Sequence, residues 1–461
     1  MNAIIFSAIM GVVMMFSGIM LPKKSSITVI AIIALVLLLA VNLLDTYSIF
    51  SVNIDTHDLL HFNKFGLFFN SILIAATIIF VLLSGSDIEK AGVNVADYYA
   101  LILFVLCGTS ILTSFNGLLM LFLGIEIMSI PLYILTGSDK KNLKSNEASL
   151  KYFLMGAFST GIMLMGIALV YGATGSFALV VITPPSSGIG ISTSFLQIAG
   201  LILLFVSMCF KVSAAPFHFW TPDVYDGAPA VFTSFMSTVV KAAGFFAFLN
   251  LFDANTNLLG PSWKILLSFV IVATLLVGNI TAVFQQSIKR MLAYSSISQA
   301  GFMLFALYSK NDLAKEGILL YAVAYCLATI GFFAVLIKVK DYTFDGFNGL
   351  AKAQPIIAFS AVVFLMSLAG IPLTAGFFAK YYMLASVVKS GGSLWFVVVA
   401  VLFASVSVYY YFKVIQSMYF KNGSPETAEI TSQFKYGVFL VAVAIIVIGV
   451  LPSLVLNWFY F

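Results

Sequence analysis

The chain has 461 residues, of which 61% are hydrophobic and 9% charged, and its formal net charge is +5. Soluble globular proteins carry about 25% charged residues, so this composition excludes that class and predicts an integral membrane protein. Nucleic-acid binding is not expected either, because the single arginine is Arg290 and no basic cluster is interleaved with aromatic residues.

Fourteen apolar runs have roughly the 20 residues that a helix needs to cross a bilayer. They cover residues 3–21, 27–50, 66–84, 98–113, 115–136, 149–172, 195–215, 229–251, 264–284, 291–309, 316–338, 355–388, 394–418 and 436–458. The runs are too long for barrel strands and do not alternate strictly. We therefore expect an all-α, polytopic membrane protein of about fourteen transmembrane helices. Thirteen remains an alternative, since only Ser114 and Asn116 separate the fourth and fifth runs.

The distribution of basic residues predicts the orientation of the chain. With the N-terminus outside, fifteen of the 23 lysines and arginines fall in cytoplasmic loops and five fall outside. The other three, Lys211, Lys241 and Lys380, lie within runs. Cytoplasmic loops are enriched in basic residues, so this bias predicts that both termini lie outside.

Two runs contain helix breaks, the seventh at Ser213 to Pro216 and the twelfth at Leu368 to Gly376. They are five spans apart, so a repeated unit would run in the opposite direction, as in transporters built from inverted repeats with interrupted helices. We expect a single membrane domain, 1–461, with four parts. These are an N-terminal three-helix part (1–94), a first five-helix repeat (95–252), an inverted second repeat (263–420) and a C-terminal helix (434–461).

Cofactor motifs are missing from the sequence. Cys107, Cys209 and Cys326 stand singly in apolar segments, and no CxxC pair occurs, so we expect no iron–sulfur, zinc or disulfide site. No GxGxxG follows a strand and no GxxxxGK[ST] occurs, so no nucleotide site is predicted. The first run starts at Ala3 without a basic n-region, and we expect it to be retained as a span.

Four charged residues lie well inside apolar runs: Glu126, Lys211, Lys241 and Lys380. Each costs roughly 2.5 to 3.5 kcal/mol at the centre of a helix, so such residues usually face protein or water. They could form buried ion pairs that only fix helix packing. We favour a proton relay, because burial favours the neutral form of each group and an opposite charge favours the ionised form.

In this relay we expect Glu126 to pair with Lys211, Lys241 to be the next carrier and Lys380 to serve the second half. A lysine can release its proton inside a protein and an arginine cannot. Polar groups near the ends of runs are expected to anchor the chain at the membrane surface. They are Lys151, His218, Trp220, Asp223, Lys289 and Arg290. The alternative is a relay role for Lys151, Lys289 and Arg290, and proton entry or gating for the other three.

Five segments together carry a resemblance to a known family: KVSAAPFHFWTPDVYDGAPAV, LGIEIMSIPLYIL, SLKYFLMGAFSTGIMLMGIALVYGATGS, IKRMLAYSSISQAGF and LAGIPLTAGFFAKYYM. They resemble the antiporter-like membrane subunits of proton-translocating NADH–quinone oxidoreductase, respiratory complex I, and among these the subunit N group. The resemblance runs from about residue 95 to the C-terminus. In that family the proton path uses a glutamate on the fifth span and lysines on the seventh, eighth and twelfth, which here match Glu126, Lys211, Lys241 and Lys380.

The resemblance implies a non-redox subunit that translocates protons in a bacterial inner membrane. NADH, flavin, iron–sulfur clusters and quinone would then be bound by partner subunits, and this chain would contact neighbouring antiporter-like subunits. The alternative is a subunit of a multi-subunit cation/proton antiporter, although one intramembrane glutamate is few carboxylates for a sodium site. A third possibility is an inert scaffold whose charges only hold helices together.

Overall fold

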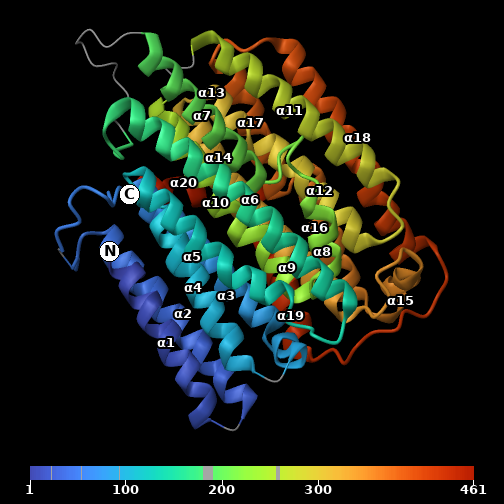
Figure 1. The fold of residues 1–461 in the computed structure, drawn as a ribbon. Helices are drawn as coiled ribbons and strands as arrows, with labels where there is room; N and C mark the ends of the chain where they lie inside the picture. The colour runs from blue at the N-terminus through green and yellow to red at the C-terminus, as the bar shows by residue number, and fades with distance from the viewer. Residues whose placement is uncertain (22, 53, 93, 180–190, 256–259, 461) are drawn as a thin grey trace.

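The computed structural model describes residues 1–460 apart from 22, 53, 93, 180–190 and 256–259, and in this part all regular structure is helical (Figure 1). β-type pairing among these residues is limited to four isolated bridges. The all-α prediction is therefore confirmed. The helices, in chain order, are α1 (Asn2–Met20), α2 (Lys24–Thr46), α3 (Lys64–Ala91), α4 (Val95–Leu112), α5 (Leu118–Thr136), α6 (Leu143–Thr174), α7 (Ile191–Lys211), α8 (Trp220–Gly227), α9 (Ala230–Phe235), the π-helical turn η1 (Met236–Val240), α10 (Lys241–Asn255), α11 (Gly260–Val283), α12 (Ile288–Met303), α13 (Phe305–Ser309), α14 (Asp312–Lys338), the 3₁₀ turn η3 (Asp345–Phe347), α15 (Leu350–Ala353), α16 (Pro355–Ala369), α17 (Ala375–Lys389), α18 (Leu394–Phe420), α19 (Ser432–Val450) and α20 (Ser453–Tyr460).

Twelve helical stretches of the described chain are long and apolar enough to cross a membrane. They correspond to twelve of the fourteen predicted runs. The seventh run, 195–215, is instead covered by α7 only as far as Lys211, and α8 begins at Trp220, beyond the break. The twelfth run is divided between α16 and α17. A total of fourteen crossings stays a prediction, because it depends on counting each interrupted run as one.

Two helix boundaries bear on the predicted runs. One excludes the thirteen-helix alternative, and the other differs from the predicted last helix. Helix α4 ends at Leu112 and α5 begins at Leu118, so the alternative that fused these two runs is wrong. The last run was predicted as one helix over 436–458, but α19 ends at Val450 and α20 begins at Ser453. Pro452 lies between them, and a proline lacks the N–H that would continue the helix.

The predicted breaks in the seventh and twelfth runs are confirmed, and polar side chains satisfy the exposed backbone. In the first break the N–H of Ala215 donates to Thr274 Oγ1 at 2.9 Å. In the second, the N–H of Gly376 donates to Ser367 Oγ at 3.1 Å. Non-helical backbone at membrane depth is tolerated only where such partners are supplied by the protein or by water.

Both termini lie at the same end of the helix bundle (Figure 1). Trp458 Nε1, near the C-terminus, donates to the hydroxyl of Tyr47, which caps α2 at that end, at 2.8 Å. A crevice of about 700 Å³ at this end is lined by residues of loops that the sequence places outside, among them Asn63 and Asp312. A crevice of about 610 Å³ is lined by Asp87 near the end of α3 and by residues of loops that the sequence predicts to be cytoplasmic, among them Asp139 and Asp341.

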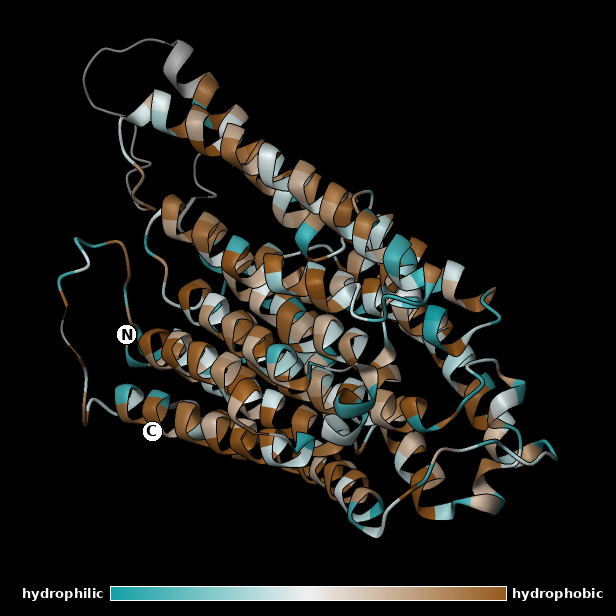
Figure 2. Ribbon diagram, turned by 60° about the horizontal axis from the view of Figure 1, so that its bottom comes forward, coloured by the Kyte–Doolittle hydropathy of each residue, from teal (hydrophilic) through white to brown (hydrophobic). Residues whose placement is uncertain are grey.

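Apolar residues extend along the helices, whereas hydrophilic residues gather at helix ends and in loops (Figure 2). The helices at the centre are α14 and the α9–α10 segment, whose apolar windows are each 94% buried. By contrast, the windows of α1, α18 and α19 are each 28% buried. The buried charges described below belong to the central region or face it.

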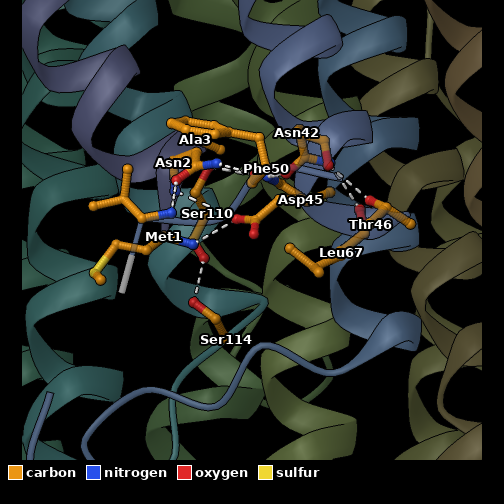
Figure 3. Close-up of polar contacts among 12 residues, drawn as sticks. Met1, Asn2, Ala3, Asn42, Asp45, Thr46, Phe50, Leu67, Ser110 and Ser114 are labelled. Carbon is orange, nitrogen blue, oxygen red and sulfur yellow. Dashed lines mark hydrogen bonds and ion pairs between the residues drawn. The ribbon is translucent and has the colours of Figure 1, made fainter. Parts of the chain in front are cut away.

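The N-terminal helices are joined by a buried polar network (Figure 3). Asn42 on α2 donates to Ser71 Oγ on α3 at 2.8 Å. Asn70 on α3 donates to Asn42 Oδ1 at 2.8 Å and to Ser110 Oγ on α4 at 3.1 Å. Polar bonds of this kind specify which faces of neighbouring helices meet where apolar contacts alone do not.

Candidate functional site: a line of buried charges

Glu126 is half-buried on α5 and is held by a neighbouring helix. Its Oε1 accepts a hydrogen bond from Thr160 Oγ1 on α6 at 2.8 Å. Thr160 also donates to the carbonyl of Gly156, one turn earlier in its own helix. The carboxylate is thus positioned by an uncharged donor.

Lys211 is the last residue of α7, directly before the first helix break. Its Nζ donates to Ser129 Oγ on α5 at 3.2 Å. Ser129 lies three residues after Glu126, so both charges meet the same face of α5 one turn apart. No ion pair within 4.0 Å joins Glu126 and Lys211 among the described residues, but the Glu126 carboxylate still acts on the Lys211 ammonium through its charge. The predicted pair therefore stays a prediction. The hydrogen-bond partner of Lys211 Nζ is the Ser129 hydroxyl and not the Glu126 carboxylate.

Lys241 follows the π-helical turn η1 and is 2% exposed. Its Nζ donates to the carbonyl of Ser296 at 2.8 Å and to the Ser296 hydroxyl at 3.0 Å, both on α12. Single π-turns inside α-helices are frequent at functional sites, because they shift the side chains that follow. Here the lysine that follows the turn meets oxygens and no carboxylate.

Lys380 lies on α17 and is 7% exposed. Its Nζ donates to the carbonyls of Leu368 and Ala369, at 3.0 and 2.8 Å, which end helix α16. The C-terminal end of a helix carries partial negative charge, and the face of Phe302, 4.8 Å from Nζ, adds a cation–π contact. The carbonyls at the end of α16, where the twelfth run is interrupted, are therefore the electrostatic partner of Lys380.

Gln299 on α12 connects Lys380 with a set of buried hydroxyl groups. Its Nε2 donates to the same Leu368 carbonyl that Lys380 uses, at 2.9 Å, and to Tyr411 OH at 3.2 Å. Tyr411 is in turn hydrogen-bonded to Ser295, the neighbour in sequence of Ser296. Helix α12 thus contacts Lys241 through Ser296 and approaches Lys380 through Gln299.

A small cavity beside this network has about 10 Å³ of space for the centre of a water molecule. It is lined by Gln299, Tyr325 and Lys380. The hydroxyl of Tyr325 is buried and has no hydrogen-bond partner among the residues that the structure describes. Space of roughly this size, with several polar neighbours, suits one water.

The structure therefore gathers the four sequence-predicted residues into two groups. Glu126 and Lys211 meet on α5, while Lys241 and Lys380 are joined through α12. Among the described residues, the hydrogen bonds of Lys211 and those of Lys241 share no partner. Sequence reasoning missed Gln299, although an amide in the middle of the apolar run 291–309 was a usable signal.

A charged cluster at the lysine-rich end of the bundle is centred on Asp223 of α8. Its carboxylate oxygens lie 3.0 Å from Lys151 Nζ on α6 and 3.0 Å from Arg290 on α12. Partial burial alone would raise the pKa of Asp223, but the hydrogen bonds and charges of Lys151 and Arg290 outweigh it and hold that pKa below its usual value. The cluster ties the end of the first broken helix to α6 and α12.

Three residues expected at the membrane surface are buried instead: His218, which is 7% exposed, and two further residues whose donors find acceptors inside the protein. Lys289 is 4% exposed, and its Nζ donates to the carbonyls of Asp226 and Ala228 at 2.7 and 2.5 Å. Trp220 is 6% exposed, and its Nε1 donates to the carbonyl of Phe210 at 3.0 Å. The predictions for Lys289 and Trp220 are wrong for the same reason, because the carbonyls freed around the break and the end of α8 accept these donors inside the protein.

The sequence of the chain matches a family of known proteins. The family model described as NADH:quinone oxidoreductase/Mrp antiporter, TM, matches residues 116–407. The chain is 40% identical over 465 residues to NADH-quinone oxidoreductase subunit N of Cytophaga hutchinsonii, covering 99% of both proteins.

Solved structures share the fold over nearly the whole chain. A chain of respiratory complex I from Thermus thermophilus is 31% identical, with a TM-score of 0.83 and coverage of 99% of this chain and 98% of that one. A chain of the Mrp complex from Dietzia sp. has a TM-score of 0.83 and covers 99% and 96%, but at 17% identity it shows the fold alone.

Proposed function

The chain belongs to the NADH:quinone oxidoreductase/Mrp antiporter transmembrane family, and we propose how its buried charges carry protons. It is a proton-translocating membrane subunit of an NADH-quinone oxidoreductase, a translocase that couples electron transfer to proton pumping. Moving one charge across 100 mV requires about 2.3 kcal/mol, so the subunit needs a driving reaction that it does not itself contain.

One observation carries the proposed relay: Lys241 and Lys380 are almost fully buried, and their ammonium groups are bonded to uncharged oxygens. A carboxylate in contact would stabilise the protonated form of each lysine more strongly than a carbonyl or hydroxyl oxygen does. Both lysines are therefore suited to gain and lose a proton during a cycle.

We assign the roles along the line of charges as follows. Glu126 and Lys211 act as the switching pair, since a small movement on α5 could exchange the Ser129 hydroxyl for the Glu126 carboxylate as the partner of Lys211. Lys241 is the central carrier and Lys380 the terminal one. Gln299, Tyr411 and a water beside Tyr325 bridge the last two. The division into 1–94, 95–252, 263–420 and 434–461 gives each repeat one broken helix and remains part of this proposal.

The family assignment also indicates the membrane and the partner subunits of the protein. The protein is a multi-pass membrane protein that works within a membrane complex. We propose the bacterial inner membrane, with both termini on the periplasmic side, and neighbouring antiporter-like subunits as direct partners. NADH, flavin, iron–sulfur clusters and quinone would be held by other subunits of that complex.

The test uses inside-out membrane vesicles in which NADH oxidation drives proton uptake. Replacing Lys241 by Met should abolish proton uptake per electron transferred, while the complex still assembles. The matched control is Lys421→Met, which removes an exposed lysine from the loop after α18. Unchanged proton uptake in Lys241→Met would contradict the relay. A sodium gradient that moves protons without NADH would instead favour the cation/proton antiporter.

A further inference from the structure

An apolar cavity of about 200 Å³ lies away from the charged line, between α3, α14 and α20. Its walls come from three parts of the chain that are distant in sequence. They include Phe68, Ile72 and Ala76 of α3, Val323 and Cys326 of α14, and Val455 of α20.

The lining identifies the kind of molecule that can enter. Apart from the Cys326 thiol and the Trp458 indole, every lining side chain is aliphatic or phenyl. Apolar cavities of roughly 150 Å³ stay dry and take up apolar ligands. The lining residues of α3 run from Phe68 to Ile79, about 16 Å along the helix axis. The cavity is therefore elongated parallel to the spans, as an extended hydrocarbon chain in a bilayer would be.

The cavity is open to the outside of the protein along one edge. Phe68 and Cys326 are buried at its base, whereas Val323 and Val455 are partly exposed and Trp458 is 41% exposed. α3 and α14, which bound it, are both long and apolar enough to cross a membrane, so this edge would face hydrocarbon in a bilayer.

Polar groups lie where the cavity reaches the end of the bundle. The ring of Trp458 packs edge-on against Phe68, with centroids 4.7 Å apart, and its Nε1 donates to Tyr47 OH. Lys64 is exposed on the first turn of α3, four residues before Phe68 and thus on the same helix face. Tryptophan, tyrosine and lysine at this depth are the residues that meet lipid headgroups.

We propose that this cavity binds one acyl chain of an anionic phospholipid, with the phosphate at Lys64 and the Tyr47–Trp458 pair. The chain would fill the space between the N-terminal three-helix part, α14 and the C-terminal helix. This site is independent of proton transfer, and its test does not depend on pumping.

The experiment uses the intact complex in a lipid bilayer. Phosphatidylglycerol with a photoreactive diazirine in one acyl chain is added, and labelled peptides are mapped by mass spectrometry. We expect labelling of both the α3 segment 68–79 and the α14 segment 323–327. Ala76→Leu should lower this labelling by at least about tenfold, because each methylene kept out is worth about fourfold in binding. Leu82→Phe, on the exposed face of α3 outside the cavity, is the matched control and should label as the unaltered protein does.

The headgroup is tested with phosphatidylcholine that carries the same acyl group. Phosphatidylglycerol should label about fivefold more, and Lys64→Gln should remove that preference, as expected for one lysine at a lipid surface. If Ala76→Leu prevents assembly, Val323→Trp blocks the cavity from its partly exposed rim. Equal labelling in the blocked and control variants would overturn the acyl-chain site, as would protection of both segments by a neighbouring subunit. Equal labelling by the two lipids would overturn the anionic headgroup.

Discussion

The ammonium nitrogen of Lys241 lies 2.8 Å from the carbonyl oxygen of Ser296 and 3.0 Å from its hydroxyl oxygen. The bond joins α10 to α12, and α12 also carries Gln299, which shares the Leu368 carbonyl with Lys380. One helix therefore contacts the surroundings of both buried lysines. A movement of α12 would change the partner of Lys241 and the bond by which Gln299 shares the Leu368 carbonyl with Lys380.

Replacing Lys241 by Arg should abolish pumping although the charge is retained. A guanidinium can donate to the same two oxygens, but it does not release its proton in a protein. Ser296→Ala removes one of the two bonds and leaves the carbonyl, so pumping should fall only by about tenfold, the order of one hydrogen bond to a charged group. Proton uptake and quinone reduction, measured in the same vesicles, check both. Normal pumping by Lys241→Arg would show that the residue only supplies charge.

Glu126→Gln should uncouple the complex without disturbing its assembly. The amide oxygen can still accept the bond from Thr160, but the side chain can no longer carry a charge or a proton. Thr160→Val is the companion variant, since it removes the bond and leaves the carboxylate, and it should have the smaller effect. The quantity to measure is protons taken up per NADH oxidised. The assignment fails if Thr160→Val is the more damaging of the two.

Gly370→Ala should impair Lys380 specifically. The backbone of Gly370 has φ +82°, and an added Cβ would lie 2.7 Å from Lys380 Cδ. Gly391 has φ +73° but open space around it, so Gly391→Ala carries a similar left-handed strain of about 1–2 kcal/mol without the collision. Pumping should fall in Gly370→Ala and persist in Gly391→Ala. If both variants lost pumping to the same extent, the cause would be backbone strain and not the collision with Lys380.

Asp87 and Lys338 form a buried ion pair between α3 and α14, with oxygen–nitrogen distances of 2.7 and 2.8 Å. Asp87→Asn should destabilise the subunit by about 3–5 kcal/mol, because it leaves a buried charge unpaired. Adding Lys338→Met should restore much of the loss. The exposed Lys340–Glu426 pair, at 3.4 Å, is the control, and Glu426→Gln should cost less than about 1 kcal/mol. Retention of the subunit in heated, solubilised complex is the measurement.

Asp223 should make the packing of α6, α8 and α12 sensitive to acid. Its pKa in the folded protein lies below the ordinary 3.8, so its stabilising effect is present above that value and is lost as the pH falls through the lowered one. The heat stability of the unaltered protein should therefore exceed that of Asp223→Asn at pH 7, and the difference should shrink as the pH falls below 3.8. A difference that persists unchanged at low pH would mean that the carboxylate does not act through its charge. The effect should be modest, since Asp223, Lys151 and Arg290 are all partly exposed.

Part of the candidate site could be read from residue types alone. A lysine or glutamate in an apolar run stands out because its burial is costly, and this identified Glu126, Lys211, Lys241 and Lys380. The burial of Lys289 and Trp220 could not be read in this way. Both lie near loops, and their acceptors are backbone carbonyls around the first break and the end of α8, which no residue type marks.

The sequence by itself determined the helical class, the positions of the two breaks and which residues carry charge into the membrane. It could do so because hydrophobic length, proline and charge act locally along the chain. Only the tertiary structure decided that Lys211 meets Ser129 in place of Glu126, and that Lys241 and Lys380 are joined through α12. Partners are chosen by distances of a few ångströms between helices that are far apart in the chain, and the pattern along one helix does not contain that information.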